Sequence, residues 1–581
     1  MRCSPGWLLP FLTLACPAPP PAPTYISSEV CLACHPAEAA RWRGSSHDRA
    51  MERPSAATVR GDFNDVRHED TRFLRRGDQY FVEVATSSGT FSRHRVAYTF
   101  GFEPLQQYLL EAKGGRLQAY AMAWDVAGER WYRVQSPELP WHGRYQNWNM
   151  MCAECHSTGV RKGYNSGTEQ YQTTFSEEDV GCQACHGPGS AHALDPQVDL
   201  QKNTSAEACA PCHSRRSPLE DPTTSGGTFS DHYRLSTLQP ALYHPDGQIL
   251  DEVFEYGSFN LSRMHRAGVT CVDCHEPHGL RASSDDTTCT RCHSPTPPIA
   301  RFPGLATLQK RYDSPEHHHH PAESPGARCV ACHLPERTYL GVDVRHDHGF
   351  QRPRPDLSHQ LGTPDGCTNS CHPGKDAAWS AGQVALWSPG PKPPHFGEIL
   401  ARAWRGEEVQ VELQSLVLDL QQSELVRASA LESLLSTRSG CAELWPRLAA
   451  DPSALVRSIA VACASPGPPS KRAESLGSAL GDPSRLVRIE AARALAGDGA
   501  KALGPELRGA FGQAREELLT ADRTQLDRPE GPFNLALLAE AEGDAEGALR
   551  LYRQALSLDP RFRPARVNLR LLERRRPVPQ P

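Results

Sequence analysis

The chain has 581 residues, a formal net charge of −6 and 20 cysteines. This length predicts several domains, and the negative charge excludes the broad basic surface by which proteins bind nucleic acids. So many cysteines are typical of an exported protein rather than a cytosolic one.

Residues 1–23 have the pattern of an export leader followed by a Pro-rich linker. Arg2 gives a charged start, and the apolar run from Trp7 to Ala15 is too short to span a bilayer. Cys16 stands where a bacterial lipoprotein would be cleaved and lipidated, so a lipid anchor there is an alternative to simple cleavage. Either way, we expect the mature protein in the periplasm or at the outer membrane surface.

Eight times between residues 31 and 372, two closely spaced cysteines are followed at once by a histidine. The pattern C-x-x-C-H attaches c-type haem, because the thiols form thioethers to the porphyrin and the histidine binds the iron. Seven motifs have this spacing: Cys31, Cys34, His35; Cys152, Cys155, His156; Cys182, Cys185, His186; Cys209, Cys212, His213; Cys271, Cys274, His275; Cys289, Cys292, His293; and Cys329, Cys332, His333. The eighth is C-x-x-x-C-H: Cys367, Cys371, His372.

Zinc is the main alternative cofactor, because paired C-x-x-C motifs also hold zinc. A zinc ribbon does not require a histidine directly after every second cysteine, and only 25 of the 581 residues are histidine. The sequence therefore predicts eight covalent haem c groups. At the eighth motif, the extra residue must bulge outward for both thiols to reach the porphyrin.

The motifs and the segments between them predict an α+β fold with three parts. Residues 24–380 form a loop-rich cytochrome region in which haem fills much of the interior, so this region should not fold without haem. Residues of about 60–145 lack motifs, and their alternating aromatic and β-branched residues predict a β-rich insert with strands near 80–84, 94–100 and 117–124. An all-α tail follows.

The tail carries two kinds of helical repeat. The tripeptide Leu-Val-Arg begins at residues 425, 455 and 486, and this interval predicts HEAT-like helix pairs over 395–515. Residues 520–575 have a tetratricopeptide-like pattern around Gly543-Asp544 and Tyr552. Cys441 and Cys463 lie in the first array, where we expect them to be ordinary buried residues.

Each haem iron also has a sixth coordination position. With 25 histidines and six methionines, histidine on both sides of the iron is the expected ligation. Local position nominates five distal ligands, each with a surface histidine as the alternative: His47, His192, His278, His320 and His348. His232 and His244 are further candidates.

Several stretches resemble exported bacterial multihaem c-type cytochromes with a HEAT/tetratricopeptide tail. They look related to the tetrahaem electron carriers of nitrifying bacteria and, more distantly, to octahaem hydroxylamine oxidoreductases. The matching stretches are 147–159, 180–192, 246–259, 268–278, 317–321, 345–358 and, with one inserted residue, 367–379. The resemblance implies that His192, His278, His320 and His348 are distal ligands.

These observations favour an electron-transfer protein in which eight haems connect a membrane donor to a periplasmic or surface acceptor. The helical tail would dock these redox partner proteins. The alternative is an oxidoreductase that acts on a small nitrogen or sulfur compound at one haem with an open sixth position. No motif ends in lysine, as some such enzymes have, and a scaffold with purely structural haems is a third class.

Overall fold

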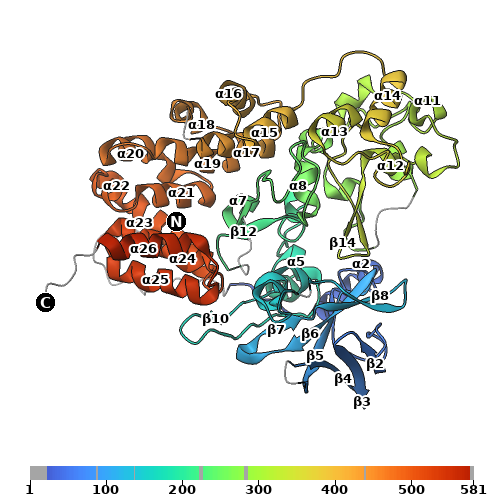
Figure 1. Cartoon of the computed structure of the whole chain (residues 1–581), viewed down its shortest axis with the longest axis horizontal. Helices are drawn as coiled ribbons and strands as arrows, with labels where there is room; N and C mark the ends of the chain where they lie inside the picture. The colour runs from blue at the N-terminus through green and yellow to red at the C-terminus, as the bar shows by residue number, and fades with distance from the viewer. Residues whose placement is uncertain are drawn as a thin grey trace, which may run out of the picture.

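The computed structural model describes residues 22–86, 89–136, 138–221, 227–279, 285–437 and 440–575. Most of the expected leader, including Cys16, the candidate site of a lipid anchor, lies outside these residues. Figure 1 shows the C-terminal helices on one side of the molecule and the sheet and motif-bearing segments on the other. The chain therefore has a β-rich N-terminal region and a helical C-terminal region, as predicted.

The β-rich region is a nine-stranded antiparallel sheet in the order β2-β3-β4-β5-β6-β8-β9, with β1 paired to β5 and β7 paired to β6. Its strands are β1 Met51–Glu52, β2 Asn64–His68, β3 Thr71–Arg76, β4 Gln79–Ala85, β5 Phe91–Phe100, β6 Leu105–Glu111, β7 Leu117–Ala119, β8 Met122–Asp125 and β9 Arg130–Arg133. Buried Phe63 packs edge-on against Phe73, Tyr80 and Tyr108, which gives the sheet its own aromatic core.

The motif-bearing region consists of short helices, turns and two-stranded ribbons. Its main elements are α1 Ser28–Cys34, α3 Trp148–Met151, α4 Ala153–His156, α5 Cys182–His186, α6 Ser190–Leu194, α8 Phe254–Leu261, α10 Thr287–Thr290, α11 Pro315–His318, α12 Cys329–His333, β14 Glu336–Tyr339, β15 Asp343–His346, α13 Pro355–Leu361 and α14 Ala377–Trp387. Most of these are too short to bury a continuous apolar face, so other groups must complete the interior.

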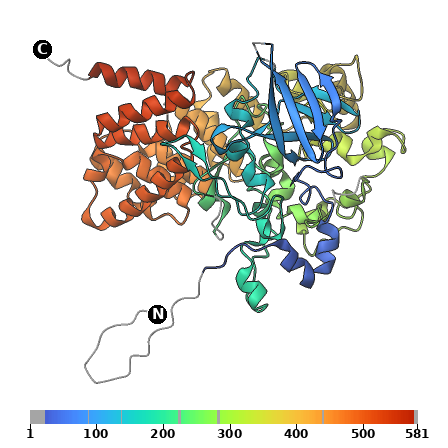
Figure 2. The ribbon, with the colours of Figure 1, turned by 90° about the horizontal axis from the view of Figure 1, so that it is seen from below.

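The tail is a stack of helices that begins at the upper centre of Figure 1, runs to the left and then continues downward into the red segment; Figure 2 shows the same stack from below. Its helices are α15 Phe396–Trp404, α16 Gln410–Leu418, α17 Glu424–Ser436, α18 Trp445–Leu448, α19 Ala454–Ala464, α20 Pro469–Leu476, α21 Arg485–Leu495, α22 Asp498–Lys501, α23 Pro505–Thr524, α24 Glu530–Glu542, α25 Ala545–Leu558 and α26 Arg563–Arg575. Leu425, Val426, Leu455, Val456 and Leu486 are all buried, so the repeated Leu-Val pairs face the helical core.

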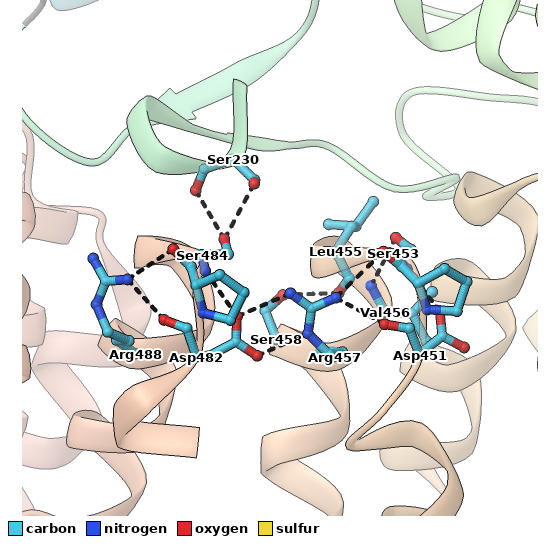
Figure 3. Close-up of polar contacts among 12 residues, drawn as sticks. Ser230, Asp451, Ser453, Leu455, Val456, Arg457, Ser458, Asp482, Ser484 and Arg488 are labelled. Atoms are coloured by element: carbon cyan, nitrogen blue, oxygen red, sulfur yellow. Dashed lines mark hydrogen bonds and ion pairs between the residues drawn. The ribbon is translucent and has the colours of Figure 1, made fainter. Parts of the chain in front are cut away.

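The arginine of each Leu-Val-Arg repeat links its helix to the next one. Arg427 pairs with Asp451, and both side chains are 4% exposed. Arg457 donates two hydrogen bonds, of 2.8 and 2.9 Å, to Asp482, and Arg488 reaches Glu517 at 2.6 Å. Figure 3 shows how Arg457 and Arg488 reach the loops that precede the helices. Each repeat therefore contributes an ion pair through its arginine as well as a buried apolar face through its leucine and valine.

The tail packs directly on the rest of the chain. Ser484 contacts Ser230 at 3.1 Å between hydroxyl oxygens (Figure 3). Lys162 Nζ lies 2.8 Å from the buried carboxylate of Asp527, and Arg528 donates to the Met150 carbonyl at 2.8 Å. One apolar cluster runs from residues 206–259 into the tail. One face of the helical tail is therefore covered by the chain itself.

Cys441 and Cys463 form a disulfide, so the expectation that they are ordinary buried residues is wrong. Cys441 lies just before the short turn that leads into α18, and Cys463 lies in α19. Their Cα atoms are 5.2 Å apart, a separation that a disulfide can span. Within the described part of the chain, we find no helix that is both long enough and apolar enough to cross a bilayer.

Candidate haem-binding site

Each motif wraps into one tight turn that brings its cysteines and histidine together. In the first motif, the amide of His35 donates to the carbonyl of Cys31 at 3.0 Å. The same bond recurs four residues apart in the motifs that begin at Cys152, Cys209, Cys271 and Cys289. In the longer eighth motif, the His372 amide reaches the Cys367 carbonyl at 3.0 Å, five residues back. A wider turn thus absorbs the inserted residue.

None of the sixteen motif cysteines takes part in a disulfide. Fifteen of them line a cavity of about 4290 Å³ together with seven of the eight motif histidines, whereas Cys371 lies elsewhere. His372 lines a smaller cavity of about 80 Å³, which it shares with His320 and His333. A pocket for one small molecule has about 300–1,000 Å³, so the large cavity has room for several large groups.

Six motif histidines face a second histidine across this space. Two imidazoles bound to one metal, each at about 2 Å through nitrogen, have ring centres about 6 Å apart. The pairs and their ring-centre distances are His35–His192 at 6.3 Å, His213–His47 at 6.4 Å, His186–His278 at 6.2 Å, His275–His348 at 6.2 Å, His333–His317 at 6.2 Å and His372–His320 at 6.1 Å. The residues present therefore fit six groups held through iron between two histidines.

The second nitrogen of several of these rings is already fixed by the backbone. Nδ1 of His186 lies 2.9 Å from the Gln201 carbonyl, and Nδ1 of His192 lies 2.7 Å from the Val198 carbonyl. His333, His320 and His348 make the same kind of contact with carbonyls of Gln351, His318 and His346. A ring that donates through Nδ1 presents Nε2 to a metal, which is the usual arrangement of ligating histidines.

The motif histidines His156 and His293 differ from the other six. Among the described residues, no second histidine faces either ring at a comparable distance. The ring of His156 packs 4.4 Å from Phe100, and burial lowers the pKa of His156 to about 4. The ring of His293 has Tyr312 at 5.7 Å, edge-on.

The histidines nominated from sequence are distributed unevenly over this site. His47, His192, His278, His320 and His348 each face a motif histidine. His232 instead contacts Glu220 at 2.5 Å, and we find no ring contact of His244 with a motif histidine in the described chain. His317 faces His333, although sequence reasoning took only the last histidine of the run 317–320. The sequence feature that could have nominated His317 as a ligand was its position three residues before His320, on the single turn of α11.

Contacts between thiols show which motifs are neighbours. Four pairs interact directly: Cys31 with Cys182, Cys155 with Cys212, Cys209 with Cys271, and Cys289 with Cys329. Three further pairs lie close enough for the charge of one thiolate to raise the pKa of the other thiol: Cys185 with Cys209, Cys274 with Cys289, and Cys332 with Cys371. Every motif therefore adjoins at least one other.

The family model described as cytochrome c554 and c-prime matches residues 133–187, which carry the motifs ending at His156 and His186. The curated protein "Multiheme cytochrome MtrA" of Shewanella baltica (strain OS185) is 26% identical over 152 residues, which are 25% of this chain and 32% of that protein. The match thus spans about a third of the relative's length. Both findings support a multihaem c-type cytochrome with covalently bound haem c.

Among solved structures, the outer cell wall cytochrome OcwA is similar over 76% of this chain and 99% of its own. The sequence identity is 18% and the TM-score is 0.42.

Proposed function

We propose that this protein is an exported cytochrome that transfers electrons through eight covalently bound haem c groups. The observation that carries the proposal is the set of six histidine pairs, each joining a motif histidine to a second histidine at 6.1–6.4 Å. The haem iron, when bound, supplies one-electron redox chemistry, whereas the chain sets ligation, spacing and electrostatics.

The roles of the residues follow from their positions. The sixteen motif thiols attach the porphyrins, and the eight motif histidines are the proximal ligands. The proposed distal ligands are His47, His192, His278, His317, His320 and His348. Backbone carbonyls at the Nδ1 atoms of several of these rings fix their orientation and leave Nε2 for iron.

The thiol contacts support one order of motifs for the electron path. Taking each motif by its first cysteine, the path runs from Cys31 to Cys182, Cys209, Cys271, Cys289, Cys329 and Cys367. The motif that begins at Cys152 joins it from the side, through Cys155 and Cys212. Cys155 Sγ also lies 3.8 Å from the Pro211 carbonyl, inside the motif that it adjoins.

The tail is proposed to consist of HEAT-like repeats over 395–515 and tetratricopeptide-like helices over 520–575. Its outer faces would dock a redox partner protein, since the inner face already packs on residues 206–259. Export to the periplasm or the outer membrane surface is consistent with haem attachment to thiols, and Cys16 is the proposed lipid anchor.

A second function is favoured by His156 and His293. A motif histidine without a facing histidine would leave the sixth position of its iron open to a small molecule. This arrangement supports the alternative of an oxidoreductase for a small nitrogen or sulfur compound, such as hydroxylamine or nitrite. Both rings are half-buried; His156 packs against Phe100, and His293 packs against Tyr312.

The first test counts haems and their ligands. The protein should be purified from a host that attaches c-type haem, and its mass should exceed that of the polypeptide by eight haems. Replacing His47→Ala should convert one low-spin haem to high spin by electron paramagnetic resonance, whereas His359→Ala, at an exposed histidine of α13, should change nothing. A colourless protein with the mass of the bare chain would refute the proposal.

The same spectra separate the two functions. The oxidised wild-type protein should show high-spin haem from at most the His156 and His293 sites. If this signal responds to nitrite or hydroxylamine, the oxidoreductase is supported. If all haem is low-spin, only electron transfer remains.

A further inference from the structure

Glu255 gives one motif histidine a different partner from the others. Its carboxylate Oε2 lies 2.9 Å from Nδ1 of His213, the position at which other ligand rings in this cavity meet a backbone carbonyl. Glu255 stands in the first turn of α8, and the amide of Tyr256 donates to the His213 carbonyl at 2.8 Å. Two adjacent residues of α8 therefore hold the motif from both its ring and its backbone.

The ring of His213 is the hydrogen-bond partner of the Glu255 carboxylate, and the 2.9 Å contact is also within ion-pair distance. The nearby guanidinium of Arg345 is already paired with Glu252 at 2.8 Å and with Asp343 at 2.7 Å. Arg345 therefore only partly offsets the carboxylate beside His213.

The motif of His213 is also the junction of the thiol contacts. Its Cys212 interacts with Cys155, and its Cys209 interacts with Cys271 and lies near Cys185. Three other motifs thus adjoin this one. Among the thiol contacts of the described residues, the motif of His156 meets the main path through Cys155 and Cys212.

We propose that Glu255 lowers the reduction potential of the haem held by His213, which lies at the junction of the path. This inference rests on the proposed attachment of haem at Cys209 and Cys212. A carboxylate that accepts from Nδ1 makes the imidazole a stronger donor to iron, which favours the ferric state. An electron that passes from the main path to the His156 site must then cross a haem of lowered reduction potential. This uphill step separates the His156 site from the main path.

The chain offers a matched control in Glu276. Its Oε1 lies 3.2 Å from Nδ1 of His278, but the same oxygen is also 3.2 Å from the guanidinium of Arg41. Arg41 offsets the charge of the Glu276 oxygen that faces His278, so this carboxylate should have little effect on the haem facing His278.

The test is a redox titration of the haem-loaded, full-length protein, followed by absorbance and electron paramagnetic resonance. Glu255→Gln keeps the shape of the side chain and removes its charge. We expect one of the eight haems to become easier to reduce by about tenfold in its equilibrium constant, or about 59 mV, with a change in one low-spin signal. Glu276→Gln should leave all potentials unchanged.

Three outcomes are informative. If the wild-type protein carries no haem, the proposed function fails first. If Glu255→Gln retains eight haems and wild-type potentials, or if Glu276→Gln shifts them equally, the role of Glu255 is refuted. If Glu255→Gln does not fold, Glu255→Asp is the second variant, because it keeps the charge but lengthens the contact with His213. A smaller rise in the reduction potential of the same haem supports the inference, and an unchanged potential refutes it.

Discussion

The segment with the last four motifs, residues 263–376, and the C-terminal helices, residues 395–575, fill their interiors in different ways. In the first, the buried apolar side chains of the described residues are Phe302, Leu334 and Leu357. In the second, leucines, valines and alanines of successive helices form a continuous core. The difference shows that the tail is stabilised by its own side chains, whereas the motif region depends on groups that fill the cavity.

The largest expected effect comes from withholding haem. We expect the full chain, produced without haem attachment, to lose the fold of residues 263–376 while the tail stays helical. Limited proteolysis with mass spectrometry should recover a resistant fragment that contains residues 395–575. If residues 263–376 also resist proteolysis in the haem-free protein, the motif region does not depend on haem to fill its interior.

A large effect confined to the tail is expected at the buried ion pair between Arg427 and Asp451. Arg427 also donates to the Val417 carbonyl at 2.9 Å, so it ties α16, α17 and the loop before α19 together. Arg427→Met leaves the buried Asp451 without its partner and should cost about 3–5 kcal/mol in the free energy of unfolding. Chemical denaturation followed by helical circular dichroism measures this cost.

Two further variants sharpen this prediction. The double variant Arg427→Met/Asp451→Leu should recover much of the loss, because it removes both charges. Lys501→Ala, which breaks an exposed pair with Asp498, should have no measurable effect. The haem absorbance should be unchanged in all three, and its loss in Arg427→Met would show that the tail and the motif region are not independent.

Much of the site was predictable because the chemistry of haem attachment is local. Two thiols and a histidine must lie within one turn, so the sequence alone identifies His35 or His213. Ligation from a distance is different. His317 meets His333, and Glu255 meets His213, across segments whose approach is set by tertiary packing. No spacing rule contains that information.

The same distinction holds for the fold. Alternation and repeats indicated the sheet and the helical tail, since both patterns are periodic along the chain. The Cys441–Cys463 disulfide was not expected, because two cysteines 22 residues apart reveal their approach only once helices pack. The contact of Asp527 with Lys162 is likewise a product of docking between distant segments.

A moderate effect is expected at this contact between the two regions. The buried Asp527 accepts from Lys162 Nζ at 2.8 Å and from the hydroxyl of Tyr171 at 3.1 Å. Asp527→Ala removes an acceptor shared by both groups, although Lys162 keeps its contact with the Thr524 carbonyl, and should cost about 1–3 kcal/mol. We expect the tail and the motif region to unfold at more widely separated denaturant concentrations, as followed by circular dichroism and haem absorbance. Glu573→Ala, at an exposed pair within the tail, is the control and should leave that separation unchanged.

The smallest expected effect is a pH dependence confined to the motif region. Burial, with the charges of Glu177 and Asp48, raises the pKa of Asp179 to about 7, and one of its oxygens is buried without a hydrogen-bond partner. An aspartate in the unfolded chain has a pKa of about 3.9. Folding therefore favours the protonated carboxyl, so its contribution to stability is full below pH of about 4 and is lost as pH rises to about 7. Asp179→Asn should remove this term, and the denaturation midpoint of the haem absorbance should then fall less between pH 5 and pH 8 than in the wild type. The denaturation midpoint of the tail, followed by helical circular dichroism, should depend on pH in the same way in the wild type and in Asp179→Asn. If the midpoint of the haem absorbance also depends on pH equally in both proteins, Asp179 is not the source of that dependence.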